Sequence, residues 1–229
     1  MISHTHKFIF IHIPKTGGNS ISKYLAELSA NRIEYRDTTP GWEGVQDINV
    51  ICELNGRWSI KHNHISYFYK GYGKKVYEDY FKFTVVRNPY DRILSHYFYS
   101  KGRDNQVFDR QEFIDFINNT QQNQVDFLIA PQAQRNVQTG RLPEHHRNSA
   151  TQLEMDYVCK LENIDRDLDY VLNKINVKKT DLDSDSLPKL NTSNHANYKE
   201  YYQGDQQLID LVQEVFAKDF EMLGYSKEI

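Results

Sequence analysis

Two short apolar runs have the composition of strands that are buried on both faces. Residues 7–13 read KFIFIHI, and residues 81–86 read FKFTVV. β-Branched and aromatic residues dominate both runs, and a turn-forming sequence follows each of them. Apolar residues then recur at the three- and four-residue spacing of an amphipathic helix, over 21–28 after the first run and over 93–98 after the second. The pattern predicts two strand–turn–helix units, the second with Asn88 as helix N-cap and Pro89 as first helical residue.

The remaining pattern predicts shorter elements. Its clearest part is a terminal helix with one apolar stripe over 208–223, which Gly224 ends. Polar segments at 135–149 and 180–186 indicate loops. The other predicted elements are strands at 33–36, 59–64 and 155–161 and helices at 112–119, 126–130 and 164–175.

Strands that alternate with helices predict an α/β fold with a mostly parallel central sheet flanked by helices. The chain of 229 residues is long enough for one sizeable domain, so we expect a single domain over 1–229. Ligands of such folds collect beyond the carboxyl ends of the strands. The turns at 14–20 and 87–95 both belong to that edge, which makes them the first places to look for chemistry.

Charge and cysteine content narrow the classes of function. A net charge of -3 argues against a nucleic-acid partner bound through a broad basic surface. The only cysteines, Cys52 and Cys159, form neither a disulfide framework nor a zinc motif. The first apolar run is too short for a transmembrane segment. We therefore expect a cytoplasmic protein, or one of the Golgi lumen if a membrane anchor belongs to it, and the oligomeric state stays open.

The turn PKTGGNS at 14–20 has the residue types of a phosphate site. Gly17 and Gly18 permit positive φ angles and bring backbone N–H groups close to oxygen atoms, with a helix N-terminus behind them. Lys15 supplies a full charge for a phosphate and for an oxygen that turns negative when a bond breaks. Further donors come from Thr16, Asn19 and Ser20. The pattern GxxxxGK[ST] of ATP- and GTP-binding loops is absent, since the lysine precedes the glycines.

A second anion site is predicted where the second unit turns. The guanidinium of Arg87 can bind a phosphate through two hydrogen bonds, and the hydroxyl of Ser95 adds a third. The alternative is an ion pair between Arg87 and Asp91. Arg92 is a lesser candidate for the ligand, with Asp91 or Asp115 as its other possible partners.

Two histidines flank one asparagine in the sequence His62-Asn63-His64. In a strand, residues two apart point to the same face. Such a pair is a metal pair, a structural pair or a catalytic base with a helper, and a metal would need a third ligand that the sequence does not identify. His12 belongs to the first predicted strand, where we expect a buried side chain with a structural role.

The chain resembles the PAPS-dependent sulfotransferases, whose donor is 3′-phosphoadenosine 5′-phosphosulfate, through PKTGGNSI and VVRNPYDRILSHY. The resemblance implies a P-loop-nucleotide-hydrolase-like sulfotransferase fold, PAPS as co-substrate and PAP as product. It places residues 15–20 at the 5′-phosphosulfate, and Arg87 and Ser95 at the 3′-phosphate. KLEN at 160–163, LPKLN at 187–191 with three tyrosines after it, and FAKDFEMLGY at 216–225 extend the resemblance over most of the chain.

KHNHIS at 61–66 looks like the H-x-H element of carbohydrate 2-O-type sulfotransferases. This implies a hydroxyl-bearing glycan or glycoconjugate as acceptor and in-line displacement at sulfur. Our hypothesis makes His64 the base, with His62 assisting and Lys15 stabilising the leaving phosphate. The scheme requires no metal ion. The alternatives are a P-loop-like nucleotide kinase and a non-catalytic nucleotide- or glycan-binding module.

Overall fold

The computed structural model describes residues 1–25, 28, 33–36, 48–51, 53–54, 57–58, 62–102, 107–129, 153–182, 187 and 196–229. Within these residues the chain has the mixed α/β architecture that the sequence predicts, with a central sheet and helices on both of its faces. No helix among them is long and apolar enough to cross a bilayer.

The central sheet is mostly parallel, as predicted. Its strand order is β1-β2-β7-β8, in which β2 pairs in parallel with β7 and β7 in parallel with β8. The first strand is antiparallel to β2. All four residues of β2 are fully buried, which explains why its sequence is a continuous apolar run instead of an alternating one. The bounds are β1 (Ile2–Ser3), β2 (Phe8–Ile11), β7 (Phe81–Val86) and β8 (Tyr157–Lys160).

Two short antiparallel pairs lie outside this sheet. The predicted strand at 33–36 is present as β3 (Ile33–Arg36) and pairs with β4 (Ile48–Ile51). A tighter pair joins β5 (Glu53–Leu54) to β6 (Arg57–Trp58).

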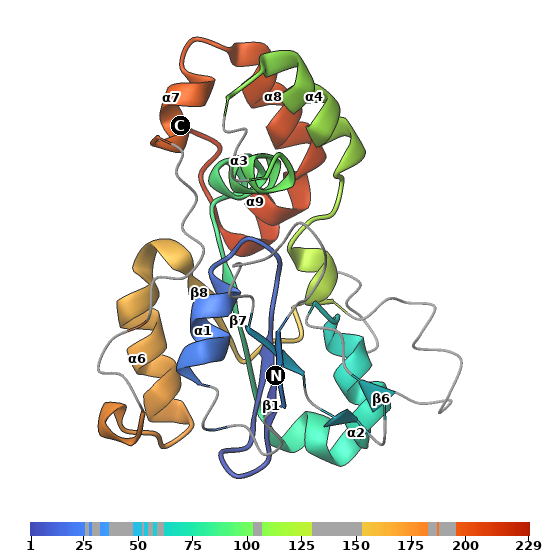
Figure 1. Ribbon diagram of the computed structural model, residues 1–229, viewed down its shortest axis with the longest axis vertical. Coiled ribbons are helices and arrows are strands. Elements are labelled where there is room, and N and C mark those ends of the chain that lie inside the picture. The colour runs from blue at the N-terminus through green and yellow to red at the C-terminus, as the bar shows by residue number, and fades with distance from the viewer. Residues whose placement is uncertain are drawn as a thin grey trace.

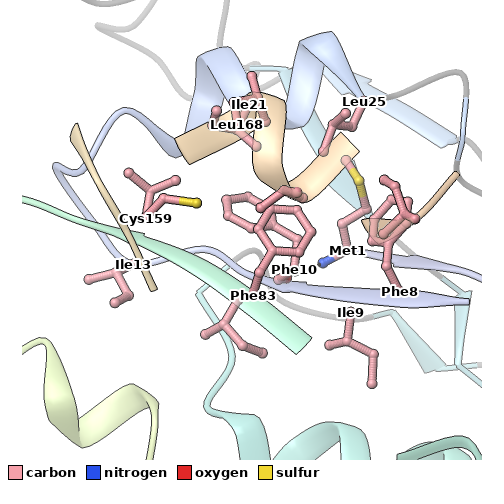
Figure 2. Packing of buried hydrophobic residues seen from close by; sticks show 14 of the residues in the cluster. Met1, Phe8, Ile9, Phe10, Ile13, Ile21, Leu25, Phe83, Cys159 and Leu168 are labelled. Carbon is pink, nitrogen blue, oxygen red and sulfur yellow. Dashed lines mark hydrogen bonds between the residues drawn. The ribbon is translucent and has the colours of Figure 1, made fainter. Parts of the chain in front are cut away.

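Helices cover both faces of the central sheet. Figure 1 shows α1 (Gly18–Tyr24) and α6 (Ile164–Lys174) on one face and α2 (Ile65–Asp79) on the other. In Figure 2, Phe10 and Phe83 point from the sheet toward Ile21 of α1 and Leu168 of α6, whereas Ile9 points away from them. Burying a side chain of this kind stabilises the fold by roughly 1.5–3 kcal/mol. This core therefore anchors the strand ends that lead into the two predicted turns.

A separate group of helices, called the helical lobe here, packs beyond the carboxyl ends of the strands (Figure 1). It has an aromatic core of its own, which includes Tyr90, Tyr202 and Phe216. The lobe consists of α3 (Pro89–Ser100), α4 (Arg110–Asn119), α7 (Tyr198–Tyr202), α8 (Gln206–Val215) and α9 (Ala217–Leu223). Because α3 follows β7 directly, the turn at 87–88 lies where the sheet meets the lobe.

The predicted terminal helix is wrong in one respect, since it is two helices. α8 ends and α9 begins at Phe216, whose φ of -107° and ψ of 27° are not helical. The apolar stripe continues through the break, so periodicity alone cannot reveal it. Phe216 is buried in the aromatic core, and the new direction of α9 buries Asp219 as well. Gly224 ends α9 in the left-handed conformation, as predicted.

Two further predictions are corrected. In place of a helix at 126–130, the described residues form one 3₁₀ turn, η2 (Val125–Phe127). The strand predicted at 59–64 is wrong for 62–64, because His64 is the N-cap of α2, a helix that the pattern did not predict. Gly73, at φ 80°, kinks α2 and interrupts its helical periodicity. Residues 59–61, 130, 135–149 and 183–186 lie outside the described residues.

Candidate functional site

The turn after β2 depends on glycine at two positions for two different reasons. Gly17 has a φ of 79°, a conformation that other residues rarely adopt. Gly18 has an ordinary φ, but a Cβ atom there would lie 2.0 Å from Cδ2 of His12. Lys15 also adopts a positive φ, 67°, which turns the chain sharply before the glycines. The backbone of the turn therefore lies directly against the imidazole of His12.

Side chains hold the carbonyl groups of four consecutive residues, 12–15. Because three of the four donors come from other parts of the chain, distant residues largely set the orientation of the peptide groups in the turn. Residues 14–17 form a hydrogen-bonded turn that leads into the N-terminus of α1. In the order of the carbonyls, the donors are His62 Nδ1 (3.0 Å), Thr16 Oγ1 (3.0 Å), Arg92 Nε (3.1 Å) and Arg87 Nη1 (3.4 Å).

Thr16 differs from its predicted role as a side-chain donor. Its hydroxyl is buried and donates to the carbonyl of Ile13, so that proton belongs to the turn itself. What Thr16 can offer a ligand is its backbone N–H. Ser20 is buried on α1, and Asn19 is half-buried beside it. With seven residues, α1 is short, so backbone N–H groups and nearby cations carry more of any anion binding than the helix dipole does.

Arg87 brings the second turn to the first. Its Nη1 lies 3.4 Å from the carbonyl oxygen of Lys15. The ion pair with Asp91, weighed above as the alternative, is also present, at 2.7 Å from Arg87 Nε. An arginine has five N–H groups, so the guanidinium keeps donors for a ligand beyond these two described bonds. Ser95 lies one helical turn after Asp91 and is buried on α3.

Arg92 ties α3 to the first turn and pairs with neither Asp91 nor Asp115. Its guanidinium donates to the carbonyl of Pro14 at 3.1 Å and to that of Gln122 at 3.0 Å. The side chain is buried, which lowers the pKa of Arg92, while the carboxylates of Asp219 and Asp126 raise it. An arginine stays charged even so, because its ordinary pKa is very high. The guanidinium of Arg92 is thus a permanent buried charge that holds the carbonyl group of Pro14 in the turn.

One face of α3 covers Lys15. The ammonium group of Lys15 lies 3.8 Å from the ring centroid of Tyr99. His96, one turn before Tyr99 along the helix, packs its ring against Phe116. Burial, together with the charges of Arg92, Lys15 and His62, lowers the pKa of His96 to about 4. Sequence reasoning missed His96, although its spacing from Arg92 and Tyr99 placed it on this face.

The two predicted histidines attach to different segments instead of sharing one strand face. His62 bonds through Nδ1 to the carbonyl of His12 at 3.0 Å, and its ring meets the ring of His12 edge-on. His64 bonds through Nδ1 to the carbonyl of Asp126 at 2.7 Å and stacks on Phe127. A carbonyl only accepts, so each Nδ1 carries the hydrogen. In the neutral state, each imidazole therefore has its lone pair on Nε2.

The described part of the chain contains no group of three or more histidine, cysteine, aspartate or glutamate side chains arranged to hold a metal ion. The third ligand that a metal at His62 and His64 would need is thus not found among the described residues.

Comparison with known proteins bears directly on this geometry. The model of the sulfotransferase family matches residues 1–226, which include both turns, the histidine pair and the C-terminal helices. Searches of curated proteins and of solved structures returned no match. The match covers almost the whole chain, and this family uses PAPS as its sulfate donor. The chain therefore belongs to the sulfotransferase family, as the motifs of the two turns implied.

Proposed function

We propose that this sulfotransferase transfers the sulfuryl group of PAPS to a carbohydrate hydroxyl, with an imidazole of the 62–64 pair as base. One observation carries the proposal: the guanidinium of Arg87 reaches the carbonyl of Lys15, at 3.4 Å. PAPS carries phosphates at the 5′ and the 3′ positions of one adenosine. Two anion-binding turns that adjoin each other suit a ligand with two neighbouring anionic groups.

The donor would be held by both turns. Residues 15–20 would bind the 5′-phosphosulfate, mainly through the N–H groups of Thr16, Gly17 and Gly18, with Asn19 and Ser20 alongside. The remaining N–H groups of Arg87 and the hydroxyl of Ser95 would bind the 3′-phosphate. Asp91 supports this role, because its carboxylate accepts a hydrogen bond from Nε of Arg87 and leaves terminal N–H groups of the guanidinium for the phosphate.

Lys15 would assist the leaving group. In the reaction, the acceptor oxygen forms a bond to sulfur while the bond from sulfur to the 5′-phosphate oxygen breaks, and PAP departs with the electron pair. The ammonium of Lys15 would stabilise the charge that develops on that oxygen. The ring of Tyr99 holds this ammonium in place at 3.8 Å, so little reorganisation is required at the moment of transfer.

The proton of the acceptor hydroxyl would pass to Nε2 of His64, with His62 assisting. Two features support a base here. Each imidazole is oriented by a carbonyl at Nδ1, which leaves Nε2 as the acceptor. His62 also packs on His12, whose ring touches Gly18, so the pair adjoins the donor turn. A carbohydrate acceptor is supported by the similarity of KHNHIS to the H-x-H element of carbohydrate sulfotransferases.

The test is transfer from radiolabelled PAPS to a panel of glycans, small alcohols and phenols. Replacement of the base, His64→Ala, should lower kcat by roughly 10²–10⁴-fold while the affinity for PAP persists. His62→Ala reports on the helper, and His4→Ala, at an exposed histidine, is the matched control. Wild-type turnover in both site variants would overturn the base assignment. Preference for phenols would overturn the acceptor class, and preference for ATP with Mg²⁺ would favour a kinase.

A further inference from the structure

A buried carboxylate from the C-terminal helix lies behind the two turns. Asp219, on α9, has no exposed surface. Its two oxygen atoms accept three hydrogen bonds, from the backbone N–H of Gln124 at 2.9 Å, from that of Val125 at 3.0 Å and from Gln124 Nε2 at 3.2 Å. Burial raises the pKa of Asp219, and Arg92 and these N–H groups counteract the increase. The carboxylate thus holds both the backbone and the side chain of Gln124.

Gln124, which is itself fully buried, in turn holds Arg87. Its Oε1 accepts the backbone N–H of Arg87 at 2.9 Å, and its Nε2 donates to the carbonyl of the same residue at 2.8 Å. This pair of bonds extends the pattern of a β-ladder past the end of β7. The two bonds fix the orientation of the peptide groups on both sides of Arg87. They therefore also fix the direction in which the side chain of Arg87 extends from the backbone.

A second connection runs through Arg92. The carboxylate of Asp219 is the largest of the charges that favour the cationic form of this buried guanidinium. Arg92 donates to the carbonyl of Pro14, the first residue of the other turn. One acidic side chain of the helical lobe therefore acts on both turns, on Arg87 through Gln124 and on the Pro14 carbonyl through Arg92.

We infer that Asp219 is a positioning residue for the donor, which sets the affinity for PAPS by holding both anion-binding turns in place from the C-terminal helix. The inference rests on the proposed donor site. It also assigns a role to Asp219, the buried one of the two acidic residues in the FAKDFEMLGY segment, which is too deeply buried to contact a ligand.

The direction in which PAP affinity changes when Asp219 is replaced distinguishes a positioning role from a purely electrostatic one. Asp219 is negative and lies near a site for anions, so by charge alone its removal should strengthen the binding of PAP. Removal of a positioning residue should weaken it. In Asp219→Asn, the new amide N–H₂ faces backbone N–H donors and cannot accept from them, so Gln124 loses part of its support.

The experiment measures PAP binding by isothermal titration calorimetry. Asp219→Asn should raise the Kd of PAP and the KM of PAPS by about tenfold and change kcat by less than about threefold. The matched control Glu221→Gln removes the same charge from an exposed position of the same helix, and its Kd should stay within about twofold of wild type. An Asp219→Asn protein that binds PAP equally well or more tightly would overturn the inference.

A double-mutant cycle tests whether Asp219 influences PAP binding through Gln124 and Arg87. If Asp219 acts largely through Arg87, then Asp219→Asn should weaken PAP binding by less than about threefold once Arg87→Ala is present. Full additivity would contradict the route through Gln124. Should Asp219→Asn fail to fold, Gln124→Met breaks the same clamp, with the exposed Gln122→Met as its control. Absence of PAP binding in the wild-type enzyme would instead refute the proposed donor site.

Discussion

His96 lies where the charges of the site converge. Its imidazole belongs to the face of α3 that covers Lys15, and Arg92 and His62 are among its electrostatic neighbours. A protonated ring would bring one more positive charge among these groups, and burial would also remove its hydration. The folded protein therefore keeps His96 neutral at neutral pH. A neutral ring can pack on Phe116 without opposing the other cations.

This protonation behaviour predicts how stability depends on pH. The pKa of His96 is about 4 in the folded protein, against an ordinary value of 6.5. Between these two values the unfolded chain binds a proton that the folded chain does not, so stability falls as the pH decreases from about 6.5 to about 4. The full shift corresponds to about 3 kcal/mol, and partial exposure of the ring reduces this to about 2 kcal/mol.

Urea unfolding of wild type and His96→Gln at pH 7 and pH 4.5 measures the effect. The variant should lose about 2 kcal/mol less than wild type over this interval, whatever its stability at pH 7. His4→Gln, at an exposed site, should follow the wild-type profile. Equal losses in wild type and His96→Gln would show that His96 is not held neutral by the fold.

At the scale of elements, the close contact between β2 and α1 shapes the turn at 14–20. His12 follows β2, and its ring occupies the space that a side chain at Gly18 would need. The carbonyl of His12 also holds His62, the residue that precedes the start of α2 by three positions. One glycine thus permits the strand, the turn and the histidine pair to adjoin each other.

Gly18→Ala should therefore affect stability and turnover together. Its Cβ would lie 2.0 Å from His12, and overpacking of this kind costs about 1–3 kcal/mol. The displaced His12 should disturb the bond to His62 and lower kcat. Gly73→Ala is the control: Gly73 has no atom within 4 Å of an added Cβ, so at its φ of 80° and ψ of 168° it should lose about 1–3 kcal/mol through backbone strain alone and keep its activity. Equal behaviour of the two variants in urea unfolding and turnover would contradict a steric role for Gly18.

At the scale of the whole molecule, two hydrophobic clusters flank the site. One lies around the sheet, and the other is the aromatic core of the helical lobe. The connections between them that are described above are polar: Asp219 with Gln124 and Val125, and Arg92 with Pro14. The two turns thus lie at a junction, and movement of one cluster against the other would separate them.

Because these buried hydrogen bonds connect the two hydrophobic clusters, we expect the clusters to unfold in one transition. Phe216→Ala removes a buried ring at the break between α8 and α9 and should cost about 3–5 kcal/mol. Far-UV and near-UV circular dichroism should report one coincident urea transition in wild type and variant alike. Val107→Ala, at a side chain that is 72% exposed, should change stability by less than about 0.5 kcal/mol. Two separate transitions would mean that the lobe unfolds independently.

Local chemistry explains which features could be predicted from the sequence. The strands β2, β7 and β8, the helix start at Asn88 and Pro89, and the stop at Gly224 each depend on residues within a few positions of one another. Helix α2 was missed because Gly73 interrupts its periodicity, and the break at Phe216 because the apolar stripe runs through it. Hydrophobic periodicity indicates which face of a helix is apolar, but it carries no information about a change in helix direction.

By itself, the sequence determined the α/β class, the positions of the two turns and the family, because the identities and spacings of neighbouring residues are sufficient for these. Only the tertiary structure decided how the turns meet and what supports them. Gln124 and Asp219 are 95 positions apart, and Arg87 and Lys15 are 72 apart. The tautomers of His62 and His64 likewise depend on carbonyls 50 and 62 positions away. Such partners are selected by the packing of the folded chain, since no local pattern records which distant polar groups will be buried together.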